Sequence, residues 1–135
     1  MRAGALTVAM LASAVACDQP VPCVEAAIHH VRAPGGTRDA SIYEGGCGPH
    51  LAPQVVIEFE TPRGKGGSGV FAVRDRTTRL GVRWLDDATL EIEYPADARI
   101  EKRDTLARFY DERVRIVYRI APPPRAPGDS ARGTT

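Results

Sequence analysis

The sequence predicts an all-β domain: an antiparallel meander of six or seven short strands, arranged as a curved sheet, a small sandwich or an open barrel. Two observations predict this class. Apolar and polar residues alternate along several segments, which is the period of a strand with one buried and one exposed face. The 13 glycines and 11 prolines among 135 residues also favour short elements joined by turns over long helices. This length allows one domain of ordinary size.

Residues 1–16 have the pattern of an export signal, which we expect to form a helix ahead of the β domain. Met1 and Arg2 give a positively charged start, and the chain is then uncharged as far as Ala16. This run is shorter than the about 20 apolar residues that a helix needs to span a bilayer. It ends in Ala14-Val15-Ala16, a small–x–small pattern that a signal peptidase accepts.

Cys17 follows this signal directly, and Ala14-Val15-Ala16-Cys17 resembles the bacterial lipobox. The resemblance implies that Cys17 becomes the lipidated N-terminus and that residues 17–22 form the anchor and tether. The protein would then sit in the bacterial cell envelope, on the periplasmic side of a membrane. The alternative is ordinary secretion into the periplasm with Cys17 unmodified. Lipidation would leave Cys23 and Cys47 as a pair, whereas three free cysteines leave one unpaired in an oxidising compartment.

The β domain is predicted over residues 23–120. Its alternation is clearest where charged residues separate apolar ones, as in Leu90-Glu91-Ile92-Glu93-Tyr94. The first segment, Val24–Val31, is compatible with a strand or a helix. Residues 121–135 contain four prolines and almost nothing to bury, which predicts a disordered tail. The predicted strands are Val24–Arg32, Asp39–Glu44, Val55–Glu60, Val70–Val73, Leu80–Trp84, Leu90–Tyr94 and Val114–Ile120.

Glycine-containing segments separate several of these strands. Pro34-Gly35-Gly36-Thr37 predicts a tight hairpin, because glycine tolerates the positive φ angles of such turns. Cys23 and Cys47 each lie twelve residues from Gly35, so an antiparallel hairpin centred there brings them opposite each other. A disulfide between them would stabilise the fold by up to about 3.5 kcal/mol. The segment Arg63–Gly69 predicts a flexible loop.

One face of each strand is expected to enter a common core. The residues between the apolar ones are mostly charged, which is the pattern of antiparallel sheets that bury one face. The residues expected to form most of the core are Ile57, Phe59, Phe71, Val82, Trp84, Leu90, Ile92, Ile116 and Tyr118.

Several of these segments together resemble small bacterial envelope proteins of a domain-of-unknown-function family. The resemblance is carried by the turn at Pro34-Gly35-Gly36, by Asp39–Glu44 with Cys47-Gly48, by Val70-Phe71 and by the block Val82–Pro95. It covers roughly residues 28–118. Because the family has no assigned activity, the resemblance implies only an all-β fold and an envelope location.

Three histidines, His29, His30 and His50, lie near Cys23 and Cys47 in the sequence and suggest a metal or ligand site. Zinc needs about four ligands at about 2.0–2.3 Å. Neighbouring strand residues point to opposite faces, so only one of His29 and His30 can join such a site. A disulfide would also remove both thiolates. We therefore expect no metal site and keep His50 as the candidate ligand residue.

Other motifs do not predict catalysis. The pair Asp86-Asp87 sits between two predicted strands, where carboxylates usually accept hydrogen bonds from turn backbone. Neither Ser41 nor Ser68 lies in a nucleophile-elbow pattern. The segment Gly64–Gly69 has its lysine ahead of the glycines and precedes a strand, unlike a phosphate-binding loop. We expect no catalytic residues and no cofactor.

Arginine is the main basic residue, with sixteen arginines and two lysines. Arg113, Arg115 and Arg119 fall on the exposed side of the last strand, near Arg99 and Arg103. They could form a docking stripe for an acidic partner or for lipid headgroups. Cross-strand pairing with glutamates is the favoured reading, worth about 0.2–1 kcal/mol per pair. The glutamates on comparable faces are Glu58, Glu60, Glu91 and Glu93.

The charge, the export signal and the motifs together favour an interaction module over other classes of protein. A net charge of +1 disfavours a nucleic-acid binder that neutralises phosphates. The sequence has an export signal and no recognisable catalytic motif. This combination suggests an accessory domain that contacts an envelope protein through a sheet face or edge. The alternative is a periplasmic protein that binds a small ligand or a metal through His50. The oligomeric state is left open.

Overall fold

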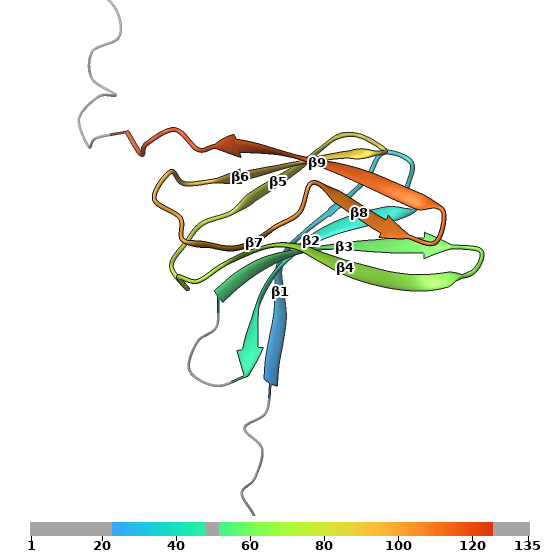
Figure 1. Cartoon of the computed structure of the whole chain (residues 1–135), viewed down its shortest axis with the longest axis horizontal. Helices are drawn as coiled ribbons and strands as arrows, with labels where there is room; N and C mark the ends of the chain where they lie inside the picture. The colour runs from blue at the N-terminus through green and yellow to red at the C-terminus, as the bar shows by residue number, and fades with distance from the viewer. Residues whose placement is uncertain (1–22, 48–51, 126–135) are drawn as a thin grey trace, which may run out of the picture.

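The computed structural model describes residues 23–47 and 52–125, and this part of the chain is all-β as predicted (Figure 1). The segment Val24–Val31 is strand and not helix. The strands are β1 (Cys23–Arg32), β2 (Arg38–Cys47), β3 (Ala52–Thr61), β4 (Gly64–Val73), β5 (Gly81–Asp86), β6 (Thr89–Tyr94), β7 (Ile100–Arg103), β8 (Leu106–Phe109) and β9 (Glu112–Ile120). Among the described residues, no helix is long and apolar enough to cross a membrane.

Several predicted features lie outside the described residues. They are the export signal at 1–16, Cys17 with the tether 17–22, His50, and the part of the tail from 126 to 135.

The strands form two sheets that share one hydrophobic core. Sheet A has the order β1-β2-β3-β4-β7, and sheet B has the order β5-β6-β9-β8. Figure 1 shows the two layers, with β5, β6 and β9 on one side of the core and β3 and β4 on the other. Of the three predicted arrangements, the small sandwich is the one that describes this pair of open sheets.

The predicted meander order is wrong. After β6 the chain leaves sheet B, adds β7 to sheet A beside β4, and returns through β8. β9 pairs with β8 as an antiparallel hairpin, and on its other side it pairs with β6 in parallel. The sequence does not predict β7 and β8, since all of β7 is exposed and β8 buries only Ala107.

The prediction of a flexible loop at Arg63–Gly69 is also wrong. Most of this segment belongs to β4, which pairs with β3 along its length. Gly66 lies against Phe109, and a Cβ atom at Gly66 would overlap the Phe109 ring. The absence of a side chain at this position therefore serves packing between the sheets.

The core agrees closely with the predicted one. The Phe59 and Phe109 rings stack across the two sheets with their centroids 5.7 Å apart. All buried hydrophobic residues among those described lie between Ala33 and Ile116. A shortened chain that begins at Asp18, after the predicted signal and Cys17, therefore keeps every one of them. Ile57, Phe59, Phe71, Leu90, Ile92 and Ile116 are buried as predicted, whereas Val82, Trp84 and Tyr118 are partly buried against them.

The β1–β2 hairpin has the predicted cysteine register. Near the turn, Arg32 pairs with Asp39, whereas at the far end Cys23 pairs with Cys47. A β-bulge between Ala27 and His29 supplies the one-residue shift between these two registers. The cysteine side chains lie outside the described part, so the disulfide itself stays a prediction.

Candidate functional site

The outer face of sheet A carries a connected set of polar side chains. Along β2, Ala40 and Ile42 enter the core, so the alternating residues Asp39, Ser41 and Tyr43 lie on the opposite face. Strand pairing then places their neighbours on the same face. His30 lies opposite Ser41 and Arg32 opposite Asp39 on β1, and Glu58 lies opposite Asp39 on β3.

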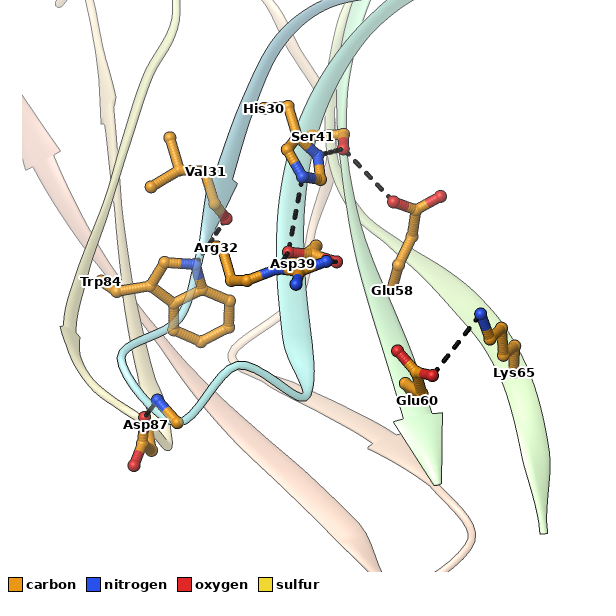
Figure 2. A network of polar contacts seen from close by, with 11 residues as sticks. His30, Val31, Arg32, Asp39, Ser41, Glu58, Glu60, Lys65, Trp84 and Asp87 are labelled. Carbon is orange, nitrogen blue, oxygen red and sulfur yellow. Dashed lines mark hydrogen bonds and ion pairs between the residues drawn. The ribbon is translucent and has the colours of Figure 1, made fainter. Parts of the chain in front are cut away.

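Ser41 is the centre of this set, and only 1% of its surface is exposed. Its Oγ lies 3.0 Å from His30 Nδ1 and donates to Glu58 Oε2 at 3.4 Å (Figure 2). The Tyr43 hydroxyl donates to the other carboxylate oxygen of Glu58 at 3.1 Å. Two neutral hydroxyls therefore hold both oxygens of Glu58 in place.

The other carboxylates of this face have cationic partners. Asp39 accepts a hydrogen bond from Arg32 Nε at 3.0 Å and lies 3.4 Å from His30 Nε2. Glu60 pairs with Lys65 across β3 and β4 at 3.5 Å (Figure 2). Among the described residues, no ion pair within 4.0 Å includes Glu58. Of Asp39, Glu58 and Glu60, Glu58 is thus the one that has no cationic partner within the described part of the chain.

A groove of about 400 Å³ runs over this face. Gly67 lies opposite Glu58 on β4 and presents no side chain there. A Cβ atom at Gly67 would lie 3.3 Å from Val56 Cγ1 and 3.7 Å from Glu58 Cγ. The glycine therefore keeps the approach to Glu58 open. The charged residues that line the groove are Arg32, Asp39, Glu58, Glu60 and Lys65.

The Ser41–His30–Asp39 contacts bring together the residue types of a nucleophilic triad. Here the serine lies beneath the sheet surface, and its hydroxyl is already engaged with His30 and Glu58. A nucleophile must reach a substrate atom at about 3–3.5 Å, which a hydroxyl buried in this way does not do. In this arrangement Ser41 positions Glu58 and does not act as a nucleophile.

Asp86 and Asp87 occupy the turn between β5 and β6. Asp86 Oδ1 accepts a hydrogen bond from the Ala88 N–H at 2.8 Å, and this bond is the main cause that holds the pKa of Asp86 below its usual value. The Asp87 carboxylate accepts a hydrogen bond from the Gly35 N–H of the β1–β2 turn. Asp86 therefore has the local backbone partner expected of a turn residue, whereas Asp87 binds the backbone of a distant turn and joins the two sheets.

The histidines of β1 do not gather metal ligands in the part of the chain that is described. Both histidines are exposed, and His30 contacts Ser41 and Asp39. Among the described residues, no group of three or more His, Cys, Asp and Glu side chains is placed to hold a metal ion. His50, the candidate ligand residue, lies outside this part of the chain.

The arginine stripe divides into two parts. Arg119 pairs with Glu93 and lies 3.6 Å from Glu91, which in turn pairs with Arg83 at 3.0 Å. This end of the stripe confirms the predicted cross-strand pairing. Arg113 and Arg115 form no such pair among the described residues. Of the two nearby arginines, Arg99 pairs with Asp75 at 2.6 Å, and Arg103 lies over the Tyr118 ring at 4.3 Å.

The polar network of sheet A is a site that the sequence reasoning missed. Alternation assigns Asp39, Ser41 and Glu58 to exposed faces, but it does not give the register between β2 and β3. That register brings Glu58 beside Ser41 and opposite Gly67. Searches of protein-family models, curated proteins and solved structures find no match to this chain.

Proposed function

We propose that this chain is an exported, lipid-anchored interaction module of the bacterial cell envelope, without enzymatic activity. The export signal and the lipobox-like segment ending in Cys17 support the address. The resemblance of residues 28–118 to envelope proteins of a domain-of-unknown-function family supports the same location. The Cys23–Cys47 register supports a disulfide, which suits an oxidising compartment.

The groove of sheet A is the proposed contact site, and Glu58 carries this assignment. The groove is lined by the carboxylates of Asp39, Glu58 and Glu60 and by the cations of Arg32 and Lys65, so the charged side chains that line it carry one more negative than positive charge. Because Glu58 is held by hydroxyls and faces a glycine, it can receive an ammonium or guanidinium group without breaking an existing ion pair. The occupant we propose is a lysine or arginine side chain on another envelope protein.

A small cationic ligand is the second candidate. A volume of about 400 Å³ falls within the range of about 300–1,000 Å³ that is typical of small-molecule sites. The same carboxylate would hold the ligand's amine. This alternative corresponds to a periplasmic small-ligand protein.

The test is a titration of the chain from Asp18 to Thr135 with a tetralysine peptide and, separately, with butylammonium, followed by NMR chemical shifts. We expect the peptide to shift amides of β2, β3 and β4. Glu58→Gln should weaken peptide binding by about ten-fold or more, because a hydrogen bond to a charged group is worth about 1.5–3 kcal/mol.

The matched control is Glu101→Gln, which removes the same charge from an exposed position on β7. It should leave peptide binding unchanged. Equal binding by wild type and Glu58→Gln would contradict the assignment of the groove. Binding of butylammonium without binding of the peptide would favour the small-ligand protein over the interaction module.

A further inference from the structure

The outer face of sheet B ends in a group of arginines on β8 and β9. Leu106 lies opposite Arg115, and Arg108 lies opposite Arg113. The residues between them, Ala107 and Val114, are buried, so all four of these side chains belong to the outer face. We call Leu106, Arg108, Tyr110, Arg113 and Arg115 the arginine patch.

The arginines of this patch are not ion-paired within residues 23–47 and 52–125. Among the described residues, no ion pair within 4.0 Å includes Arg108, Arg113 or Arg115. The glutamates of the neighbouring strand lie further along it, with Glu91 beside Val117 and Glu93 beside Arg119.

The turn carboxylates beside the patch have other partners. Asp111 lies 3.7 Å from Arg63, and Glu112 pairs with Arg38. Asp86 accepts a hydrogen bond from the Ala88 N–H. Arg115 is near enough to contribute to the lowered pKa of Asp86. Like charges directly opposite in a ladder destabilise a sheet, so the Arg108–Arg113 pair works against folding.

Two exposed hydrophobic side chains belong to the same β8–β9 hairpin as these arginines. Leu106 is 38% exposed and Tyr110 is 59% exposed. Tyr110 also has a φ angle of 52°, in the left-handed region where residues other than glycine are strained. The Tyr110 ring packs against Phe109 and lies under the Arg63 guanidinium, which is 5.5 Å from the ring centroid, at the turn of the hairpin that carries Arg108 and Arg113. A strained, exposed aromatic residue at the end of this hairpin suggests a contact surface, because such strain persists mainly at functional positions.

We propose that the arginine patch docks the domain onto the surface of a membrane that contains anionic phospholipids. Arginines bind lipid phosphates, and tyrosine and leucine insert at the level of the headgroups. An acidic protein would match the arginines but not the exposed leucine and tyrosine, so the observations favour the membrane. This inference concerns a different sheet from the groove and does not depend on the function proposed for it.

The experiment is sedimentation of the chain from Asp18 to Thr135 with vesicles, which removes the signal and the acyl group as causes of binding. We expect binding to vesicles of phosphatidylcholine with about one third phosphatidylglycerol, and loss of binding at high salt. Each arginine should contribute about five-fold to partitioning, so R108Q/R113Q/R115Q should lose about 100-fold. Tyr110→Ser should also weaken binding to these vesicles.

The control R83Q/R99Q/R119Q removes the same number of charges from exposed arginines that are ion-paired. It should reduce partitioning by less than about five-fold. Equal losses in the two triple variants, or equal binding to pure phosphatidylcholine, would overturn the proposal. A second result would also overturn the proposal: polyglutamate binds the patch as tightly as the vesicles do, and Tyr110→Ser weakens neither interaction. The partner of the patch would then be an acidic protein and not a membrane.

Discussion

Tyr110 begins the two-residue turn between β8 and β9 in a conformation that glycine adopts more easily. At a φ of 52°, the Cβ atom of an L-residue crowds the backbone, at a cost of about 1–2 kcal/mol. Two contacts offset part of this cost. The Tyr110 ring packs edge-on against Phe109 with centroids 4.7 Å apart, and the Arg63 guanidinium lies 5.5 Å from the ring centroid.

This strain predicts an unusual order of stability between two variants. Tyr110→Gly and Tyr110→Ala lose the same ring contacts and differ only in the Cβ atom. Elsewhere in a fold, alanine is usually the more stabilising of the two, but at this position Tyr110→Gly should be more stable by about 1 kcal/mol. Urea unfolding followed by circular dichroism measures the difference. A more stable Tyr110→Ala would show that the turn is unstrained.

Tyr118 shows a second local effect of burial. Its ring lies among Phe71, Tyr94 and Arg103, and its hydroxyl donates to the Asp104 carbonyl at the start of the loop into β8. Burial raises the pKa of Tyr118 to about 12, above its usual 10.0. The hydroxyl therefore keeps its proton, and can donate this hydrogen bond, at alkaline pH where an exposed tyrosine ionises.

At the scale of elements, β4 shows how glycines can form a strand. Gly66 and Gly67 face opposite sides of sheet A, with Gly66 against Phe109 of sheet B and Gly67 beside Glu58 in the groove. Each position needs the absence of a side chain for a different reason. The glycine-rich sequence of this segment predicts a loop, because the sequence does not reveal that Phe109 and Glu58 lie beside these two glycines.

The contrast between two glycines of β4 gives a test. Gly66→Ala places a methyl group in the Phe109 ring and should destabilise the fold by about 1–3 kcal/mol, the usual cost of overpacking. Gly69→Ala is the control, because a Cβ atom there has no neighbour within 4 Å. It should be neutral or stabilising by about 0.5 kcal/mol. Equal midpoints for the two variants in thermal unfolding would refute the proposed role of Gly66.

The β1–β2 hairpin illustrates what local sequence can specify. The glycine turn and the cysteine spacing are enough to predict Cys23 opposite Cys47. The bulge between Ala27 and His29 is not predictable in the same way, because nothing in the alternation of these exposed residues marks it. The bulge shifts the pairing of β1 with β2 by one residue, so one hairpin contains both the register near the turn and the register that pairs the cysteines.

At the scale of the whole molecule, three polar contacts tie the two sheets together at one corner. Trp84 of β5 donates its indole N–H to the Val31 carbonyl of β1 at 2.9 Å (Figure 2). The Gly35 N–H donates to the Asp87 carboxylate, and Arg38 donates to the Asp87 carbonyl. Trp84 is therefore partly buried at the rim, because its indole must reach an edge strand of the other sheet.

The proposed envelope address gives a prediction for the processed protein. Its intact mass should correspond to a chain that begins at Cys17, increased by the acyl modification and decreased by two hydrogens for a Cys23–Cys47 disulfide. After a high-salt wash that removes peripherally bound protein, the wild type should stay with the membranes, whereas Cys17→Ser should be recovered in the soluble fraction. A mass equal to an unmodified Cys17 chain would instead favour ordinary secretion, and retention of all cysteine hydrogens would exclude the disulfide.

The sequence by itself determined the all-β class of the domain, six of its buried core residues, and the register that pairs Cys23 with Cys47. These features follow from the period of two and from one turn, which are local properties of the chain. Only the tertiary structure decided that β6 pairs with β9, that β7 and β8 are strands, and that Glu58 and the arginines of the patch have no ion-pair partner in the described part of the chain. The physical reason is that strand partners are chosen by burial between distant segments, and the exposed edge strands carry little alternation from which to predict them.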